Sequence, residues 1–162
     1  LTAVMQLYNN QIIRNIDSIA KGFSNVCEAT GLMGRWQQIQ ENPIVICDTG
    51  HNEAGWKDLS LQIKNQKCLN LRIVFGMVDD KDIEAVMALL PENAHYYWTQ
   101  PSTKRAFAVA KIAEVGERYG LKGRTFTNVE EAYKQALSES DEDDFIFVGG
   151  SSYVVADLLS KF

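Results

Sequence analysis

Ile44-Val45-Ile46-Cys47-Asp48-Thr49-Gly50-His51-Asn52 combines the pattern of a buried strand with that of a polar turn and a helix start. Its four leading apolar residues, two of them isoleucine, are typical of a strand that is buried on both faces of a sheet. Gly50 permits a tight turn, and Asn52 is a good N-cap for the amphipathic segment that follows. In α/β proteins, this succession of strand, turn and helix N-terminus is where ligands bind. The stretch therefore predicts a central strand and a candidate site together.

The same succession recurs along the chain. Apolar runs predict further strands within residues 69–77, 94–99, 125–127 and 145–148, and residues 35–39 are expected to form a short strand or extended arm. Apolar side chains at helical spacing predict helices within residues 52–65, 83–90, 108–120, 128–136 and 152–162. Phe162 is expected on the apolar face of the last helix, and Asp80 in a polar turn before the second.

Short apolar strands that alternate with helices predict a mostly parallel sheet with helices on both faces and right-handed crossovers. We therefore expect an α/β fold, a Rossmann-like domain of three layers with roughly five strands. The functional loops of such a sheet lie at the carboxyl ends of its strands. Here these loops are residues 48–52, 76–82, 99–105 and 149–153.

The first thirty residues form a separate segment. Residues 1–10 are compatible with a short helix, and apolar positions from Ile16 to Cys27 follow a helical stripe that Asn15 or Asp17 could cap. Gly31 and Gly34 end this helix, and residues 29–34 are expected to act as a hinge. The segment carries no recognisable chemistry of its own.

Composition limits the classes of function. The chain has 162 residues, of which 46% are hydrophobic, and this suits one domain of ordinary size with a short appendage. A net charge of −5 and scattered basic residues argue against nucleic-acid binding. The three cysteines show no CxxC spacing, and Cys27 and Cys47, which lie in apolar segments, are expected to be buried thiols in a reducing cytoplasm. No apolar run is long enough to cross a membrane. Because the chain starts at Leu1 without a signal peptide or an initiating Met, we expect it to be a piece of a longer protein.

Asp48 and His51 are the first candidates for chemistry. A carboxylate and an imidazole at the end of a strand can hold a nucleotide, a metal or a proton. Alternatively, Asp48 caps the next helix and His51 bonds to the backbone. A metal site is the weaker interpretation because no second His or Cys has ligand spacing nearby. Arg35, which follows a glycine pair, could reach a phosphate as a mobile cation or could be an ordinary surface residue.

Two further turns could bind anions. Lys81 stands at a helix start, where a cation is unfavourable unless nearby aspartates or an anionic ligand offset it. Gly149 and Gly150, followed by Ser151, Ser152 and Tyr153, resemble an anion-binding nest at a helix N-terminus, although such turns also serve only as caps. The chain has no GxxxxGK[ST] phosphate loop, no GxGxxG fingerprint and no GxSxG elbow, so its catalytic machinery is incomplete.

Four motifs, in order and at suitable spacing, resemble one enzyme family. They are Gly34-Arg35-Trp36-Gln37, the stretch Ile46–Asn52, Val74-Phe75-Gly76-Met77 with Lys81-Asp82, and Val148-Gly149-Gly150-Ser151-Ser152-Tyr153. Over roughly residues 17–162 they are similar to the C-terminal domain of folylpolyglutamate synthase/dihydrofolate synthase, in the ATP-dependent Mur ligase superfamily. The family usually has Asp-Gly-Ala-His-Asn where this chain has Asp48-Thr49-Gly50-His51-Asn52.

The resemblance implies a larger ligase. Its N-terminal domain would carry the phosphate loop, the Mg²⁺ ligands and most of the folate site, so this chain supplies no metal ligand. Residues 1–30 would be the helical end of that domain plus the linker, and residues 31–162 the Mur ligase-type, glutamate ligase domain. In such enzymes ATP phosphorylates a folate or dihydropteroate carboxylate, and the amine of L-glutamate attacks the acyl phosphate.

The resemblance also implies residue roles on the ATP side. Arg35, Asp48 and His51 would contact ATP, with Asp48 and His51 as the catalytic residues. These groups would meet the nucleotide when the domains close, so we expect the 48–52 turn to be exposed in this chain alone.

On the amino-acid side, the resemblance implies that Lys81 holds the carboxylate of L-glutamate, and that Ser151, Ser152 and Tyr153 complete its pocket. Two alternatives stay open. The chain could be a nucleotide- or anion-binding module without catalysis, or part of a Mur-type ligase that acts on a cell-wall precursor.

Overall fold

The computed structural model describes residues 2–79 and 81–161, so Leu1, Asp80 and Phe162 lie outside the described residues. The expected places of Asp80 in a turn and of Phe162 on a helix face therefore have no structural counterpart here. The chain divides into two compact units, Leu1–Arg35 and Trp36–Phe162, and each is described by itself. Within the described ranges, none of the helices has the length and apolar content needed to cross a membrane.

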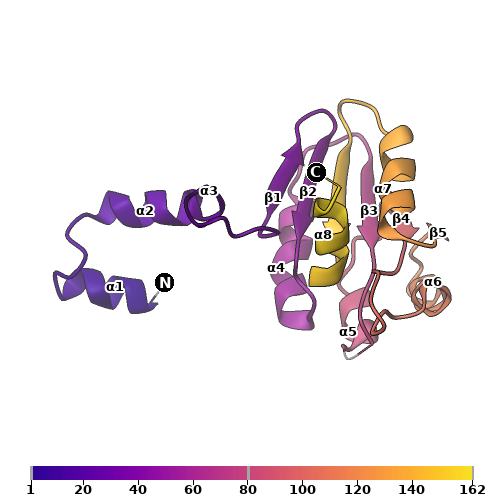
Figure 1. Cartoon of the computed structure of the whole chain (residues 1–162), viewed down its shortest axis with the longest axis horizontal. Helices are drawn as coiled ribbons and strands as arrows, with labels where there is room; N and C mark the ends of the chain where they lie inside the picture. The colour runs from indigo at the N-terminus through magenta and orange to yellow at the C-terminus, as the bar shows by residue number, and fades with distance from the viewer. Residues whose placement is uncertain (1, 80, 162) are drawn as a thin grey trace. The chain divides into compact units, whose positions relative to one another are not determined.

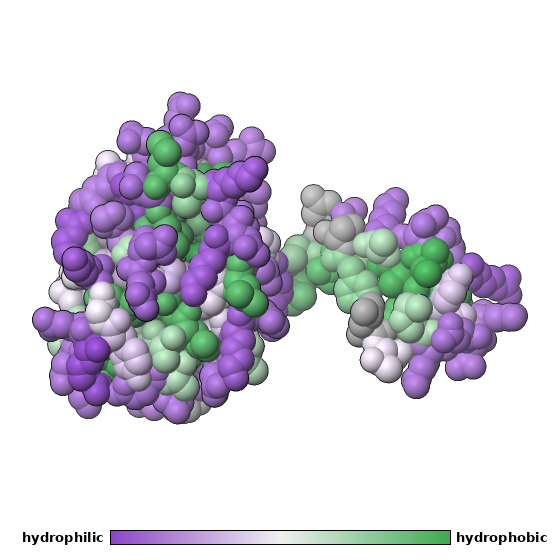
Figure 2. All heavy atoms as spheres, turned by 180° about the vertical axis from the view of Figure 1, so that it is seen from behind, coloured by the Kyte–Doolittle hydropathy of each residue, from purple (hydrophilic) through white to green (hydrophobic). Residues whose placement is uncertain are grey.

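The first unit is helical, with α1 at Thr2–Asn9, α2 at Ile16–Ser24 and α3 at Val26–Thr30. Asn15 caps α2, because its side-chain oxygen accepts a hydrogen bond of 2.8 Å from the backbone N–H of Asp17. The single helix expected from Ile16 to the glycines was wrong: it is interrupted at Asn25, a residue type that competes with helical backbone bonds. Figure 2 shows hydrophobic residues on the surface of this unit, and its exposed large apolar side chains include Met5, Leu7, Ile12, Ile16 and Phe23.

The second unit is built on one mixed sheet (Figure 1). Its strands are β1 (Gln37–Gln40), β2 (Ile44–Asp48), β3 (Leu71–Phe75), β4 (Ala94–Trp98), β5 (Gly123–Thr125) and β6 (Phe145–Gly149). Their order is β1-β2-β6-β3-β4-β5, and only β1 runs antiparallel to its neighbour. The mostly parallel sheet is thus confirmed, and the extended arm proves to be its antiparallel edge strand.

The strand expected at residues 125–127 lies two residues earlier. Gly123, Arg124 and Thr125 pair with Tyr96, Tyr97 and Trp98. A β-carbon at Gly123 would lie 2.6 Å from the Tyr96 β-carbon, so glycine permits this close pairing. The apolar signal at Phe126 therefore marks the end of the strand and not its centre.

Helices cover both faces of the sheet, as expected for three layers. α4 (Glu53–Lys64), α5 (Ile83–Met87) and α6 (Val109–Arg118) pack on one face. α7 (Val129–Ser138) and α8 (Ser152–Leu159) pack on the other, and Figure 1 shows α4 and α8 on opposite sides of the strands. Alternation along each strand sends neighbouring side chains to opposite faces. Phe75 and Phe147 belong to the first core and Val74 and Val148 to the second.

The first core centres on Trp56 of α4, which has no exposed surface. Its ring meets Phe75 and Phe147 edge-on, with centroids 5.6 Å away in each case. Such edge-to-face contacts add to the free energy of apolar burial. Since Phe75 ends β3 and Phe147 lies in β6, this cluster holds α4 against the strands whose ends form the candidate site.

A buried ion pair lies at the amino end of the sheet. Arg72 in β3 is 8% exposed and Asp144, just before β6, is 2% exposed. The Arg72 guanidinium donates to the Asp144 carboxylate and to the Glu139 carbonyl. Asn70 adds hydrogen bonds to the same carboxylate from its backbone N–H, at 3.0 Å, and from its side-chain amide, at 2.8 Å. The Asp144 carboxylate therefore has the additional hydrogen bonds that a buried charge requires, whereas Nε of Arg72 has no hydrogen-bond partner.

Candidate functional site

The strand order creates a topological switch point at the carboxyl end of the sheet. β6 lies between β2 and β3. The helices that follow β2 and β3 pack on one face, whereas the helix that follows β6 packs on the other. The chain therefore leaves neighbouring strand ends in opposite directions, and ligands of α/β proteins bind at such switch points. This brings the predicted loops 48–52, 76–82 and 149–153 to one edge.

Asp48 ends β2 with both carboxylate oxygens occupied. Oδ1 accepts a hydrogen bond of 2.7 Å from the backbone N–H of Gly50, and Oδ2 accepts one of 2.7 Å from that of Trp36. The side chain does not cap α4, since Asn52 does so by accepting from the N–H of Gly55 at 2.9 Å. The helix cap predicted at Asn52 is confirmed.

The expected exposure of this turn is only partly correct. Asp48 is 8% exposed and Gly50 is buried, while Thr49 and His51 are half-buried and Asn52 is exposed. The expectation was wrong for Asp48 because the chain at Trp36 folds back over its carboxylate. A β-carbon on Gly50 would lie 2.3 Å from a Leu59 methyl group, so this turn is packed directly against α4.

His51 presents its imidazole from the same turn. Its Nδ1 lies 3.0 Å from the carbonyl oxygen of Thr49, which is the backbone contact that the structural interpretation anticipated. When Nδ1 carries the proton it donates to that carbonyl, and Nε2 is then the nitrogen that can meet a ligand. The backbone contact therefore orients the ring and does not exclude a binding role.

The β3 and β6 turns approach each other closely. The backbone N–H of Gly76 donates to the carbonyl of Gly149 at 3.2 Å. A β-carbon at Gly150 would lie 2.5 Å from the carbonyl oxygen of Gly76, and φ at Gly150 is +97°. Only glycine fits both the dihedral angle and the space. Gly76 and Gly150 thus allow the turns that follow β3 and β6 to lie in close contact.

Replacing Gly150 by alanine is expected to lower the free energy of unfolding by about 1–3 kcal/mol, because it adds a steric clash to an unfavourable positive φ. Gly120 is the matched control, since its φ is +73° but nothing lies within 4 Å of an added β-carbon. Gly120→Ala isolates the cost of the dihedral angle alone. Urea denaturation should rank Gly150→Ala as clearly more damaging, and equal losses would contradict the steric argument.

The glutamate-side candidates occupy the neighbouring turns. Ser151 is 1% exposed and caps α8, because its hydroxyl accepts from the N–H of Tyr153 at 3.1 Å. Ser152 is exposed and Tyr153 is 41% exposed. Lys81 is half-buried in the loop between β3 and α5. The serine turn is thus a helix cap, and its exposed members are Ser152 and Tyr153.

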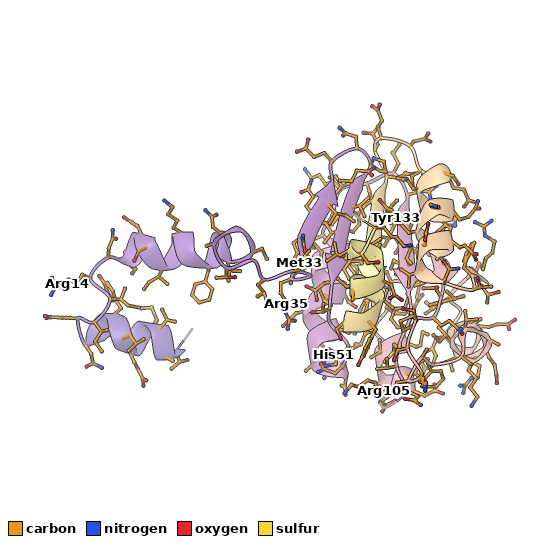
Figure 3. The ribbon with its side chains drawn as sticks, viewed as in Figure 1. Arg14, Met33, Arg35, His51, Arg105 and Tyr133 are labelled. Atoms are coloured by element: carbon orange, nitrogen blue, oxygen red, sulfur yellow. The ribbon has the colours of Figure 1, made fainter. Side chains whose placement is uncertain are left out.

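Arg105 is a cation at this edge that the sequence analysis did not name. Its carbonyl accepts a hydrogen bond of 2.9 Å from the N–H of Asp79, which joins the β3 and β4 loops. Figure 3 shows Arg105 and His51 at the same end of the sheet. The loop 99–105 was predicted to lie there, but no periodic signal singled out one of its residues. Arg35 is exposed and belongs to the helical unit.

A second charged cluster lies along β4 and β5, beside a depression of about 390 Å³ that His95, Tyr97, Arg124 and Glu139 help to line. Its charges are paired within the protein. Arg124 donates to Glu139 at 2.6 Å, and the Tyr97 hydroxyl donates to the same carboxylate at 2.6 Å. This cluster is therefore better suited to stabilise the sheet than to bind a ligand.

Metal binding was tested against the side chains of the described ranges. Among residues 2–79 and 81–161, no group of three or more His, Cys, Asp or Glu side chains could hold a metal ion. The described residues therefore offer no preformed site with three protein ligands for Mg²⁺.

Comparison with known proteins identifies the family. Residues 34–152 match the family model described as Mur ligase, glutamate ligase domain. A dihydrofolate synthase/folylpolyglutamate synthase of Buchnera aphidicola is 29% identical over 98% of this chain, which spans 38% of that protein. The chain spans 15–38% of the length of the curated relatives that it matches.

Solved structures agree with the sequence match. Escherichia coli FolC in complex with DHPP and ADP superimposes with a TM-score of 0.73 and 28% identity, over 80% of this chain and 31% of that one. A bifunctional folylpolyglutamate synthase/dihydrofolate synthase with Mn, AMPPNP and L-glutamate bound gives a TM-score of 0.72 and 31% identity over the same shares. The chain therefore belongs to the Mur ligase family and corresponds to the C-terminal, glutamate ligase domain of folylpolyglutamate/dihydrofolate synthases.

Proposed function

We propose that this chain is the C-terminal part of a two-domain ATP-dependent ligase that adds L-glutamate to a folate or dihydropteroate carboxylate. The observation that carries the proposal is the glycine-lined edge at the carboxyl ends of β2, β6 and β3, with His51 and Lys81 in its turns. This edge occurs in a domain of the glutamate ligase family. Residues 1–30 are assigned to the end of the preceding domain plus the linker, and residues 31–162 to the ligase domain.

On the ATP side, we assign Arg35, Asp48 and His51. ATP supplies the phosphoryl group that converts a carboxylate into a better acylating agent. The negative charge that develops on the phosphates must be met by cations and hydrogen-bond donors. Arg35 supplies a permanent positive charge and His51 a ring nitrogen. Relatives with bound ADP or AMPPNP support a nucleotide as a ligand of the full-length protein.

On the amino-acid side, we assign Lys81 to a carboxylate of L-glutamate, with Ser152 and Tyr153 beside it and Ser151 shaping the turn. A cation and exposed hydroxyl groups suit an anionic amino acid. The relative with bound L-glutamate supports this substrate. The amine attacks the acyl carbon, the amide bond forms and phosphate leaves. Closure of the two domains would exclude water from the acyl phosphate.

In this proposal the ligands of Mg²⁺ lie on the other domain. No step assigned to this chain therefore runs through a metal. The partners of the chain are ATP, L-glutamate, the folate or dihydropteroate substrate and its own N-terminal domain, without a nucleic acid or a membrane. A cytoplasmic location stays a prediction.

The test compares ATP hydrolysis by this chain alone with that by the full-length protein. Hydrolysis that depends on both L-glutamate and a folate or dihydropteroate is expected only from the full-length protein. The chain alone should turn over no ATP. Dependence on another amino acid with a cell-wall precursor would favour the Mur-type alternative. Micromolar ATP binding by the chain alone, lost on Ser151→Ala and without turnover by the full-length protein, would favour a binding module.

A further inference from the structure

We propose that Asp48 is a positioning residue, whose carboxylate fastens the linker end at Trp36 to the turn that presents His51. The contact is internal to the second unit and joins residues far apart in sequence. The inference rests on the proposed function for the identity of the positioned groups. The two hydrogen bonds to Asp48 are themselves a property of this chain. They add a positioning role to the assignment of Asp48 on the ATP side.

The first argument concerns the hydrogen bonds that the Asp48 carboxylate accepts. Each oxygen of Asp48 accepts a backbone N–H at 2.7 Å, one from Trp36 and one from Gly50. Hydrogen bonds to a charged acceptor are stronger than neutral ones. The residue is also only 8% exposed, so little of its surface can reach a ligand. Both observations favour an internal bridge.

The second argument is the backbone of Trp36. Its φ is +44°, a conformation that is unusual for a bulky residue and persists only where the surroundings hold it. The Trp36 ring lies 6.4 Å from the Phe145 ring and 6.2 Å from the Phe147 ring, between centroids. Trp36 is therefore held at two points, its ring by β6 and its N–H by Asp48.

The third argument is where Trp36 and Gly50, whose N–H groups donate to Asp48, lie in the sequence. Trp36 directly follows Arg35, and Gly50 directly precedes His51. Arg35 and His51 are the cation and the imidazole assigned to the phosphates. One carboxylate thus bonds to the backbone next to each of them. Loss of the bridge would free the backbone that directly follows Arg35 and the backbone that directly precedes His51.

Amide hydrogen exchange of this 162-residue chain tests the bridge without any activity. In the wild-type chain, the Trp36 and Gly50 amides should exchange at least about tenfold more slowly than in an unstructured peptide. Asp48→Asn keeps the shape but replaces one acceptor oxygen by a donor. It should accelerate exchange of at least one of these amides by about 10- to 100-fold, as expected for loss of a charge-assisted hydrogen bond.

Asp58→Asn is the matched control, since Asp58 is an exposed aspartate on α4. It should leave both rates within about twofold of the wild type. Unprotected Trp36 and Gly50 amides in the wild-type chain would overturn the proposal, as would unchanged rates in Asp48→Asn. The wild-type measurement can overturn the proposal by itself, even if the variant does not fold.

Kinetics of the full-length protein test whether the bridge positions Arg35 and His51. If Asp48 acts through Arg35 and His51, His51→Ala should lower kcat by a much smaller factor in an Asp48→Asn background than in the wild type. Losses that multiply would indicate independent contacts and overturn the positioning role. If the full-length wild type shows no glutamate-dependent ATP hydrolysis, the proposed function fails while the exchange result stands. The two failures are therefore distinguishable.

Discussion

Replacing Asp144 by alanine is expected to lower the free energy of unfolding by about 3–5 kcal/mol, because it leaves a buried arginine without its carboxylate. Arg72 is 8% exposed and donates to Asp144 from β3. Its Nε already has no hydrogen-bond partner, so the site has no spare acceptor to replace the lost one. Urea denaturation followed by circular dichroism measures the change in the free energy of unfolding.

Glu53→Ala provides the control for this prediction. Lys57 and Glu53 also form an ion pair, at 2.7 Å, but their side chains are 60% and 54% exposed. Water screens such a pair, and its loss should cost at most about 0.5 kcal/mol. Comparable losses for the buried and the exposed pair would contradict the assignment of Asp144 as the counter-charge of Arg72.

The buried Asp144 and its neighbour Glu139 predict that the protein loses stability in acid. Burial raises the pKa of Asp144, but hydrogen bonds from Asp141 and Asn70 and the charge of Arg72 outweigh it, so the net pKa lies below the ordinary value. Hydrogen bonds from Arg124 and Tyr97 hold the pKa of Glu139 at about 2. Both pKa values are lower in the folded state than in the unfolded one. Their contribution to stability is therefore present near neutral pH and is lost as pH falls from about 5 toward 2. Glu139→Gln should make this fall in the urea midpoint shallower.

The second large effect concerns activity. His51→Ala in the full-length protein is expected to lower kcat for glutamate-dependent ATP hydrolysis by roughly 100-fold or more. This is the size of effect seen when one preorganised group that meets developing negative charge is removed. His51 is half-buried and its imidazole contacts the carbonyl of Thr49, two residues away, so we expect the fold to tolerate the loss of the ring. The melting temperature of the variant should therefore stay close to that of the wild type.

His95→Ala is the matched control, because His95 is the other histidine of the chain and is exposed on β4. It removes the same chemical group from a strand position instead of from the carboxyl edge. Its kcat should stay within about twofold of the wild type, as for most surface substitutions. Equal losses in the two variants, or full activity in His51→Ala, would return His51 to a purely structural role.

Local sequence patterns were sufficient to predict most of the fold. The four apolar residues at the start of the Ile44–Asn52 stretch and the run at residues 145–148 both form buried central strands. Asn52 caps the helix that it was expected to cap, and Asn128 caps the helix that was predicted to start at residue 128. These features depend on near neighbours in the chain, through side-chain alternation and local hydrogen bonds. The order of the strands was not encoded locally, since β6 enters between β2 and β3 from the far end of the chain.

The candidate site divides in the same way. From sequence alone, Asp48, His51, Lys81 and residues 151–153 could be assigned to strand ends, because each follows an apolar run. Only the tertiary structure decided that Asp48 is buried, because its partner Trp36 lies twelve residues away in a segment without strong periodicity. The loop 99–105 was expected at this end of the sheet, but only the structure singled out Arg105 within it, through a backbone bond to Asp79. Residue types and spacing determine which groups are available, and long-range packing determines which of them face a ligand and which hold the protein together.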